Sequence, residues 1–231
     1  MLMLDPTPKV ITFDCYGTLV QWHRAMRDAA LLALSTHDTD VSKAQAASLA
    51  DQIRSTATAH QQRQPYRTYA SVLRSSLEEA LAAAGHVATE EDHRTLWSTL
   101  SRIAPHPDTP AALTGLRTRY RLAIISNTDD DLIAGTVAAI GTPIDFVITA
   151  QQASAYKPDH RLFEHAHAKM GVTKDETIHV AMGQFADLKV CRELGIRSVW
   201  IDREGEPLDP QWSPDAVLPD LSALPELLLV P

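Results

Sequence analysis

Short runs of β-branched and other apolar residues recur along the chain, and each ends at a polar or turn-forming residue. The first run is Val10–Phe13, which leads into Asp14. Four similar runs follow, at 122–125, 146–148, 178–182 and 198–201. Runs of this length and composition are typical of strands buried on both faces of a parallel sheet. The pattern therefore predicts five core strands, each of which feeds a polar loop.

Helical periodicity separates these runs in the second half of the chain. The predicted helices are 130–140, 161–170 and 186–194. They are followed by Gly141, Gly171 and Gly195, and glycine readily takes the left-handed conformation that ends a helix. Alternating strands and helices predict an α/β fold, a Rossmann-like parallel sheet with helices on both faces. The tail from 204 to 231 is expected to wrap this core without catalytic content.

The segment 20–104 differs from the rest because it carries helical patterns and no convincing strand. Its stretches rich in Ala and Leu predict helices at 24–35, 42–60, 66–84 and 90–102. Prolines at 105, 107 and 110 mark the return to the strand-and-helix pattern. We therefore expect an α/β core made of 1–19 and 105–231, into which a helical cap of 20–104 is inserted.

Polar residues at the ends of three predicted strands indicate a functional site. Asp14 follows the first strand, Ser126 the second, and the segment 183–187 the fourth. Ligands of parallel α/β sheets bind at the carboxyl ends of the strands, so these residues are expected to meet. A carboxylate held at a strand end, facing the amides of the next loop, can act as a covalent nucleophile. A single Asp in that place could also simply cap its loop.

Four short motifs follow one another along the chain: Phe-Asp-Cys-Tyr-Gly-Thr-Leu at 13–19, Ser-Asn at 126–127, Tyr-Lys-Pro-Asp at 156–159 and Gly-Gln-Phe-Ala-Asp at 183–187. Together they resemble the motifs of the haloacid dehalogenase (HAD) superfamily, and in particular its L-2-haloacid dehalogenase (type II) branch. The resemblance extends over the whole chain, including the helical cap. It implies a hydrolase, a 2-haloacid dehalogenase, in which Asp14 attacks a small carboxylic acid and forms an aspartyl ester.

The resemblance also implies a role for each catalytic residue. Lys157 would sit beside Asp14 and keep its carboxylate ionised. Asp187 would orient or activate the water that hydrolyses the ester, and it could also cap the helix that follows it. Ser126 would hydrogen-bond Asp14 or the substrate carboxylate. Thr18 would donate a hydrogen bond to Asp14 or cap the next turn.

The substrate-binding candidates are less specific than the catalytic ones. They are Tyr16, Arg54, Tyr69, Asn127, Phe163, Gln184 and Phe185. The cap of the family supplies an arginine that receives the departing halide; Arg54 is the nearest candidate, with Arg63 next and Gln52 as an amide partner. Asn127 would line the leaving-group pocket or form a turn. The aromatic residues would form apolar walls, although aromatic residues at such positions are as often part of the core.

The residue two positions after Asp14 separates two kinds of HAD enzyme. Phosphatases of the superfamily place a second Asp there to protonate the leaving alkoxide, whereas this chain has Tyr16. A halide leaves as a stable anion and needs no proton. Gln184 stands where the phosphatases carry an acidic magnesium ligand. We therefore expect no metal and no cofactor. The alternatives are a Mg²⁺-dependent phosphatase with Asp187 as metal ligand, and a catalytically weak relative that only binds a small anion.

Charge and composition exclude other classes of function. The formal net charge of −8 argues against nucleic acid as a partner, because phosphate backbones are bound by clustered Lys and Arg. Cys15 and Cys191 lack the spacing of a metal or redox site and are expected to be free thiols. No apolar stretch is as long as a membrane helix, and residues 1–9 do not resemble a signal peptide. We expect a cytoplasmic protein without membrane contact, and the resemblance implies pairing into a homodimer through the caps.

Overall fold

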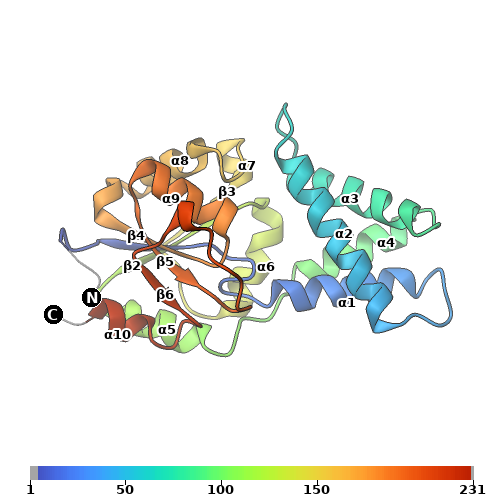
Figure 1. Cartoon of the computed structure of the whole chain (residues 1–231), viewed down its shortest axis with the longest axis horizontal. Coiled ribbons are helices and arrows are strands. Elements are labelled where there is room, and N and C mark those ends of the chain that lie inside the picture. The colour runs from blue at the N-terminus through green and yellow to red at the C-terminus, as the bar shows by residue number, and fades with distance from the viewer. Residues whose placement is uncertain (1–4, 230–231) are drawn as a thin grey trace.

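A six-stranded sheet in the order β3-β2-β1-β4-β5-β6 forms the core of the computed structural model, which describes residues 5–229 (Figure 1). All neighbouring strands pair in parallel. The strands are β1 (Val10–Phe13), β2 (Arg121–Ser126), β3 (Phe146–Thr149), β4 (Thr177–Ala181), β5 (Arg197–Ile201) and β6 (Ala216–Leu218). The predicted parallel α/β fold is confirmed. Residues 1–4 of the segment compared with signal peptides and residues 230–231 of the predicted tail lie outside the described residues.

The tail contains a strand that the sequence analysis missed. Residues Ala216–Leu218 pair with β5 and extend the sheet by one edge strand. The sequence does not reveal this strand because it has only three residues, none of them fully buried, and so lacks the apolar run of a core strand. Its pairing comes from its place beside β5.

Strand β1 lies in the middle of the sheet, between β2 and β4. Phe13 pairs with Ile124 on one side and with Val180 on the other. The chain builds the sheet outward from β1 in one direction and then crosses to β4 to build the other half. Ligands of open α/β sheets bind at such a switch point, at the carboxyl ends of the strands. Asp14, which follows β1, therefore emerges at the centre of that edge.

Helices cover both faces of the sheet. They are α5 (Thr109–Leu116), α6 (Asp130–Ile140), α7 (Ala150–Ala153), α8 (His160–Met170), α9 (Lys189–Leu194) and α10 (Leu224–Leu229), with 3-10 turns at η1 (Lys174–Glu176) and η3 (Pro210–Trp212). In Figure 1, α7, α8 and α9 lie on one side of the sheet, and α5 and α10 lie on the other. The helices α6, α8 and α9 end at Gly141, Gly171 and Gly195, whose φ angles are 73°, 65° and 67°. These positive angles confirm the predicted left-handed caps.

The helix predicted over 186–194 is not a single α-helix. It begins as a π-helical turn, η2 (Gln184–Leu188), and continues as α9. The amide of Leu188 donates to the carbonyl oxygen of Gly183, five residues earlier. Such turns often occur at functional sites, because the wider turn re-aims the side chains. Here the turn buries Asp187 and leaves Phe185 on the surface.

Between β1 and α5 the chain forms four helices: α1 (Trp22–Leu34), α2 (Lys43–Gln61), α3 (Tyr69–Ala83) and α4 (Glu90–Leu100). Figure 1 shows them as a separate bundle beside the sheet. The chain leaves and re-enters the core at one place, where the amide of Gln21 donates to the carbonyl oxygen of Ala104. That residues 20–104 form a separate inserted domain remains our interpretation. Within residues 5–229, no helix has the length and apolar composition needed to cross a bilayer.

A core carboxylate holds the cap bundle over the strand ends. Asp129 lies just before α6, and its two oxygens accept the backbone amides of Tyr69 and Ala70, at 2.9 and 2.8 Å. These amides belong to the first turn of α3, where backbone donors have no partner inside the helix. Asp129 therefore caps α3 of the cap bundle and places Tyr69 beside the loops that follow β1 and β2.

Candidate active site

Asp14 is held by backbone and side-chain bonds at the end of β1. Its amide donates to the carbonyl oxygen of Val180 on β4, at 3.0 Å. The Thr18 hydroxyl donates to Asp14 Oδ2 at 2.8 Å, and it accepts the amide of Met182 at 2.9 Å. Thr18 thereby links the loop after β1 to the loop after β4. The carboxylate is fixed in orientation before any substrate arrives.

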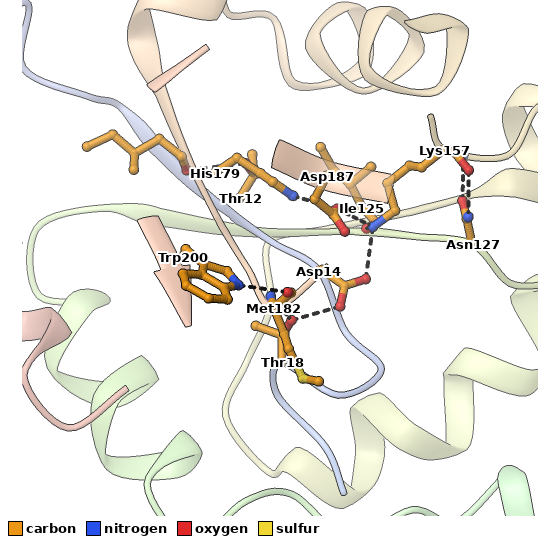
Figure 2. A network of polar contacts seen from close by, with 11 residues as sticks. Thr12, Asp14, Thr18, Ile125, Asn127, Lys157, His179, Met182, Asp187 and Trp200 are labelled. Carbon is orange, nitrogen blue, oxygen red and sulfur yellow. Dashed lines mark hydrogen bonds and ion pairs between the residues drawn. The ribbon is translucent and has the colours of Figure 1, made fainter. Parts of the chain in front are cut away.

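Lys157 lies between two carboxylates (Figure 2). Its Nζ atom is 2.8 Å from Asp14 Oδ1 and 2.6 Å from Asp187 Oδ1, and it also donates to the carbonyl oxygen of Ile125 at 3.0 Å. An ammonium group has three hydrogens, and these three acceptors use them all. Lys157 is only 2% exposed and Asp187 1%, so the two carboxylates share one buried cation.

Asp187 has a second partner that the sequence analysis missed. The Nε2 atom of His179 lies 2.9 Å from Asp187 Oδ1, and its Nδ1 atom lies 2.8 Å from the hydroxyl of Thr12 on β1. His179 is fully buried in β4. The available signal was one histidine inside an otherwise apolar strand run. Periodicity alone treats such a residue as core.

Burial and the mutual charges shift the pKa values of Asp14, Asp187 and Lys157 in different directions. Burial raises the pKa of Asp14, and the charge of Asp187 adds to this rise, although Lys157 opposes it. Burial also disfavours the charge on Asp187, but Lys157 and the bond from His179 outweigh it and lower the pKa of Asp187. Burial likewise opposes the charge on Lys157, yet the two carboxylates raise the pKa of Lys157. Asp187 is thus the more firmly ionised of the two acids.

Ser126 and Asn127 follow β2 and differ in their contacts. The Ser126 hydroxyl is buried and has no hydrogen-bond partner within residues 5–229. The Asn127 side chain accepts the amide of Lys157 at 2.7 Å and donates to the Lys157 carbonyl oxygen and to Gln61 Oε1, both at 3.0 Å. Asn127 therefore fixes the backbone of the lysine loop and joins it to α2.

A cavity of about 250 Å³ opens above these groups. Its floor comes from the core and contains Asp14, Ser126, Asn127, Lys157 and Asp187. Its opposite wall comes from the first three helices of the cap and contains Trp22, Met26, Arg54, Ala57, Gln61 and Tyr69. The cavity is smaller than a drug-sized pocket and suits a small molecule. The floor is mainly polar, and the cap wall mixes apolar side chains with polar ones such as Arg54 and Gln61.

Comparison with known proteins identifies the family. Residues 8–181 match the model of the haloacid dehalogenase-like hydrolases. This chain belongs to that family. The resemblance inferred from the four motifs is therefore confirmed, and so is the assignment as a hydrolase.

Relatives of this hydrolase carry two different activities in their names. A phosphoserine phosphatase of Thermus thermophilus is 32% identical over 153 residues, which are 65% of this chain and 61% of the relative. An (S)-2-haloacid dehalogenase 4A of Burkholderia cepacia is 27% identical over 221 residues, 89% of this chain and 88% of the relative. The structure of L-2-haloacid dehalogenase from Xanthobacter autotrophicus superposes with a TM-score of 0.83 at 22% identity, over 96% of this chain and 99% of that chain. The match to the phosphatase thus spans less than two thirds of that relative. The likeness to the solved structure shows the fold.

Most of the predicted site residues of this hydrolase meet at the cavity. Those that line it are Asp14, Tyr16, Arg54, Tyr69, Ser126, Asn127, Lys157 and Asp187. Thr18 lies directly behind Asp14. Arg54 is the one arginine among the described residues that line the cavity. Arg63 and Gln52 border other hollows. The sequence analysis missed Trp22, Met26, Ala57 and Gln61, because a position on a cap helix does not indicate which face docks on the core.

Three predicted substrate contacts of this hydrolase lie elsewhere. Phe163 is fully buried in α8 and meets the ring of His179 edge-on, with 4.9 Å between ring centroids, so it is core behind the site. Phe185 is 43% exposed and packs against Trp212. The Gln184 amide is used by the tail, accepting from the amide of Asp209 at 2.8 Å and donating to the Pro207 carbonyl oxygen at 3.1 Å. The π-helical turn points these last two side chains away from the cavity.

The groups around Asp14 do not suit Mg²⁺, which prefers oxygen ligands in octahedral geometry. The ammonium of Lys157 lies between the carboxylates of Asp14 and Asp187, where a cation shared by both would have to bind. Tyr16, which lines the same cavity, is a phenol and adds no carboxylate. Within residues 5–229, no group of three or more His, Cys, Asp and Glu side chains is placed to hold a metal ion.

Gly183 makes room for the Asp187 carboxylate. A Cβ atom at position 183 would lie 2.4 Å from Asp187 Oδ2. We therefore expect Gly183→Ala to displace Asp187 and to lower kcat by about a hundredfold, the usual effect of moving a catalytic group by about 1 Å. The measurement is steady-state turnover with thermal unfolding in parallel. Gly115→Ala is the matched control, because its Cβ would meet only Pro225 at an ordinary 3.6 Å. Equal turnover in both variants would contradict the expectation.

Proposed function

We propose that this hydrolase is a metal-independent 2-haloacid dehalogenase that acts through an ester of Asp14. The observation that carries the proposal is the ammonium of Lys157 between the two carboxylates. It supplies the positive charge of the site without a metal ion and leaves one carboxylate to attack and the other to activate water. The dehalogenase relative that matches most of the chain supports the same reaction.

The proposed reaction has two steps. An oxygen of Asp14 attacks the α-carbon of the acid, the carbon–halogen bond breaks, and halide leaves with the bonding electrons, which inverts the α-carbon. Asp187 then takes a proton from water, and the water oxygen attacks the carbonyl carbon of the ester. The bond between Cγ of Asp14 and the substrate oxygen breaks, and the departing 2-hydroxy acid takes the proton that Asp187 accepted. Asp14, left as a carboxylic acid, releases its proton to solvent. The net products are the hydroxy acid, halide and one proton, and Asp14 is restored.

Tyr16 supports a halide rather than an alkoxide as the leaving group. An alkoxide needs a proton donor beside the nucleophile. Tyr16 occupies the position of that donor, and burial raises the pKa of Tyr16 above its ordinary value, which makes the phenol a poor acid near neutral pH. Halide departure needs no acid, so the site lacks nothing that this reaction requires.

The unpartnered Ser126 hydroxyl supports a carboxylate as the recognised group. A buried hydroxyl without a partner is costly, and a substrate carboxylate would satisfy it. The apolar wall of Trp22, Met26 and Ala57 would then cover the substituent on the α-carbon. We assign Arg54, which lines the cavity, to the departing halide. The partner is accordingly a small carboxylate.

The deciding experiment measures halide release from L-2-chloropropionate and chloroacetate, with and without EDTA. EDTA-resistant release supports the dehalogenase. Mg²⁺-dependent hydrolysis of p-nitrophenyl phosphate without halide release would overturn it in favour of the phosphatase. No activity in either assay, with binding of the small carboxylate retained, would indicate a small-anion-binding relative.

The pH profile provides a further prediction. Asp14 attacks only when ionised, and burial raises the pKa of Asp14 above its ordinary 3.8. Activity should therefore fall as the pH falls through a value higher than 3.8. The measurement is kcat/KM for chloropropionate from pH about 4 to 8. A profile that stays flat down to the ordinary pKa of an aspartate would contradict it.

A further inference from the structure

We infer that His179 is a positioning residue for the second step, holding Asp187 so that one of its oxygens is left to activate water. The inference rests on the proposed function, because it assumes that an ester of Asp14 is hydrolysed. None of the four motifs contains His179. Its place in the middle of a buried strand gives it no route to the substrate, so any effect on the reaction must pass through Asp187.

The hydrogen-bond pattern assigns the proton of the imidazole. Asp187 is a carboxylate and can only accept, so the Nε2 atom of His179, at 2.9 Å, must carry a hydrogen. The Nδ1 atom lies 2.8 Å from the Thr12 hydroxyl, which also donates to the Ile178 carbonyl oxygen at 3.2 Å. Thr12 thereby holds the ring in one orientation. This second contact anchors the donor itself (Figure 2).

The two donors divide the Asp187 carboxylate into an anchored oxygen and a free one. His179 and Lys157 both bond Oδ1, at 2.9 and 2.6 Å. Within residues 5–229, no hydrogen-bond donor contacts Oδ2. That oxygen lies beside Gly183, in the wall of the cavity. It is therefore the oxygen available to take a proton from water.

His179 matters most after the first step. Lys157 is shared with Asp14 in the resting site, and forming the ester removes the charge of Asp14. The ammonium is then free to change its position, whereas the imidazole is held by Thr12 and by the edge contact with Phe163. The fixed donor keeps Asp187 oriented while the ester waits for water. A preorganised donor of this kind costs no rearrangement when the reaction occurs.

The test separates the two steps in the full-length protein. His179→Leu removes the donor, and His179→Gln offers an amide N–H in a comparable place. Rapid-quench halide release reports the first step, and intact-protein mass spectrometry reports the ester. We expect His179→Leu to keep the first burst of halide, to slow ester hydrolysis about ten- to hundredfold and to accumulate the ester. His179→Gln should recover part of the second step.

Two further variants keep the outcome decisive. His160→Leu is the matched control, because His160 begins α8 and its Nε2 atom lies 2.7 Å from Glu193 on the surface. If His179→Leu does not fold, Thr12→Val tests the same series of contacts. It removes the hydroxyl that holds Nδ1 of His179 and should slow ester hydrolysis by a smaller factor. Equal slowing of both steps, or no accumulated ester, would overturn the inference while the dehalogenase stands. Absence of halide and ester in the unaltered protein would overturn both.

Discussion

Asp14→Asn should abolish turnover, with a loss on the order of a millionfold, as expected for removal of a covalent nucleophile. The amide keeps the shape of the side chain and can still accept from Thr18, which donates to Asp14 Oδ2. It has no carboxylate oxygen to attack the α-carbon. Halide release in a single turnover is the measurement. Digestion after one turnover in heavy-oxygen water should place the label in Asp14 of the unaltered protein.

The same substitution should leave the fold intact. In the resting protein the carboxylates of Asp14 and Asp187 share the single ammonium of Lys157. Removing one negative charge leaves a balanced pair, so the midpoint of thermal unfolding should stay the same or rise. Asp159→Asn is the control for turnover, since Asp159 caps α8 and bonds Arg161 outside the cavity. Measurable halide release by Asp14→Asn, or label found only in the product, would contradict the ester mechanism.

Lys157→Met should have the largest effect on stability. Methionine has a similar length and no charge, so two buried carboxylates would be left without their cation. Breaking a buried ion pair in this way costs about 3–5 kcal/mol of unfolding free energy. Turnover should be lost as well, because without the ammonium the pKa of Asp14 would rise further and the nucleophile would be protonated. Denaturant unfolding and halide release measure the two effects.

The pH dependence of that loss has a definite sign. As the pH falls, one of the two carboxylates takes up a proton and the repulsion between them disappears. The difference in unfolding free energy between Lys157→Met and the unaltered protein should therefore shrink toward acid pH. The double variant Lys157→Met, Asp187→Asn should regain stability without regaining turnover. Lys169→Met, at an exposed position on α8, should cost less than about 1 kcal/mol. An equal loss in the two lysine variants would contradict the shared-cation site.

Local pattern was sufficient to predict most of the fold. The strand runs ending at Asp14 and Ser126, the glycines after the helices and the helical stretches of the cap depend on residue periodicity and turn chemistry, which act over a few residues. The same local rules failed at β6, whose pairing depends on its neighbour β5. They also failed at η2, where one widened turn decides which side chains face inward.

The sequence by itself determined the parallel α/β fold, the helical stretches between β1 and α5 and the motif residues, because each rests on a pattern or spacing along the chain. Only the tertiary structure decided what those residues do to one another. Lys157 is 143 positions from Asp14, and the packing of the loop between α7 and α8 against the strand ends brings its Nζ atom to 2.8 Å from Asp14 Oδ1. Phe163 became core, His179 became a partner of Asp187, and the cap wall was formed by helix faces that no spacing distinguishes. Contacts between elements depend on how the elements pack, and local periodicity does not contain that information.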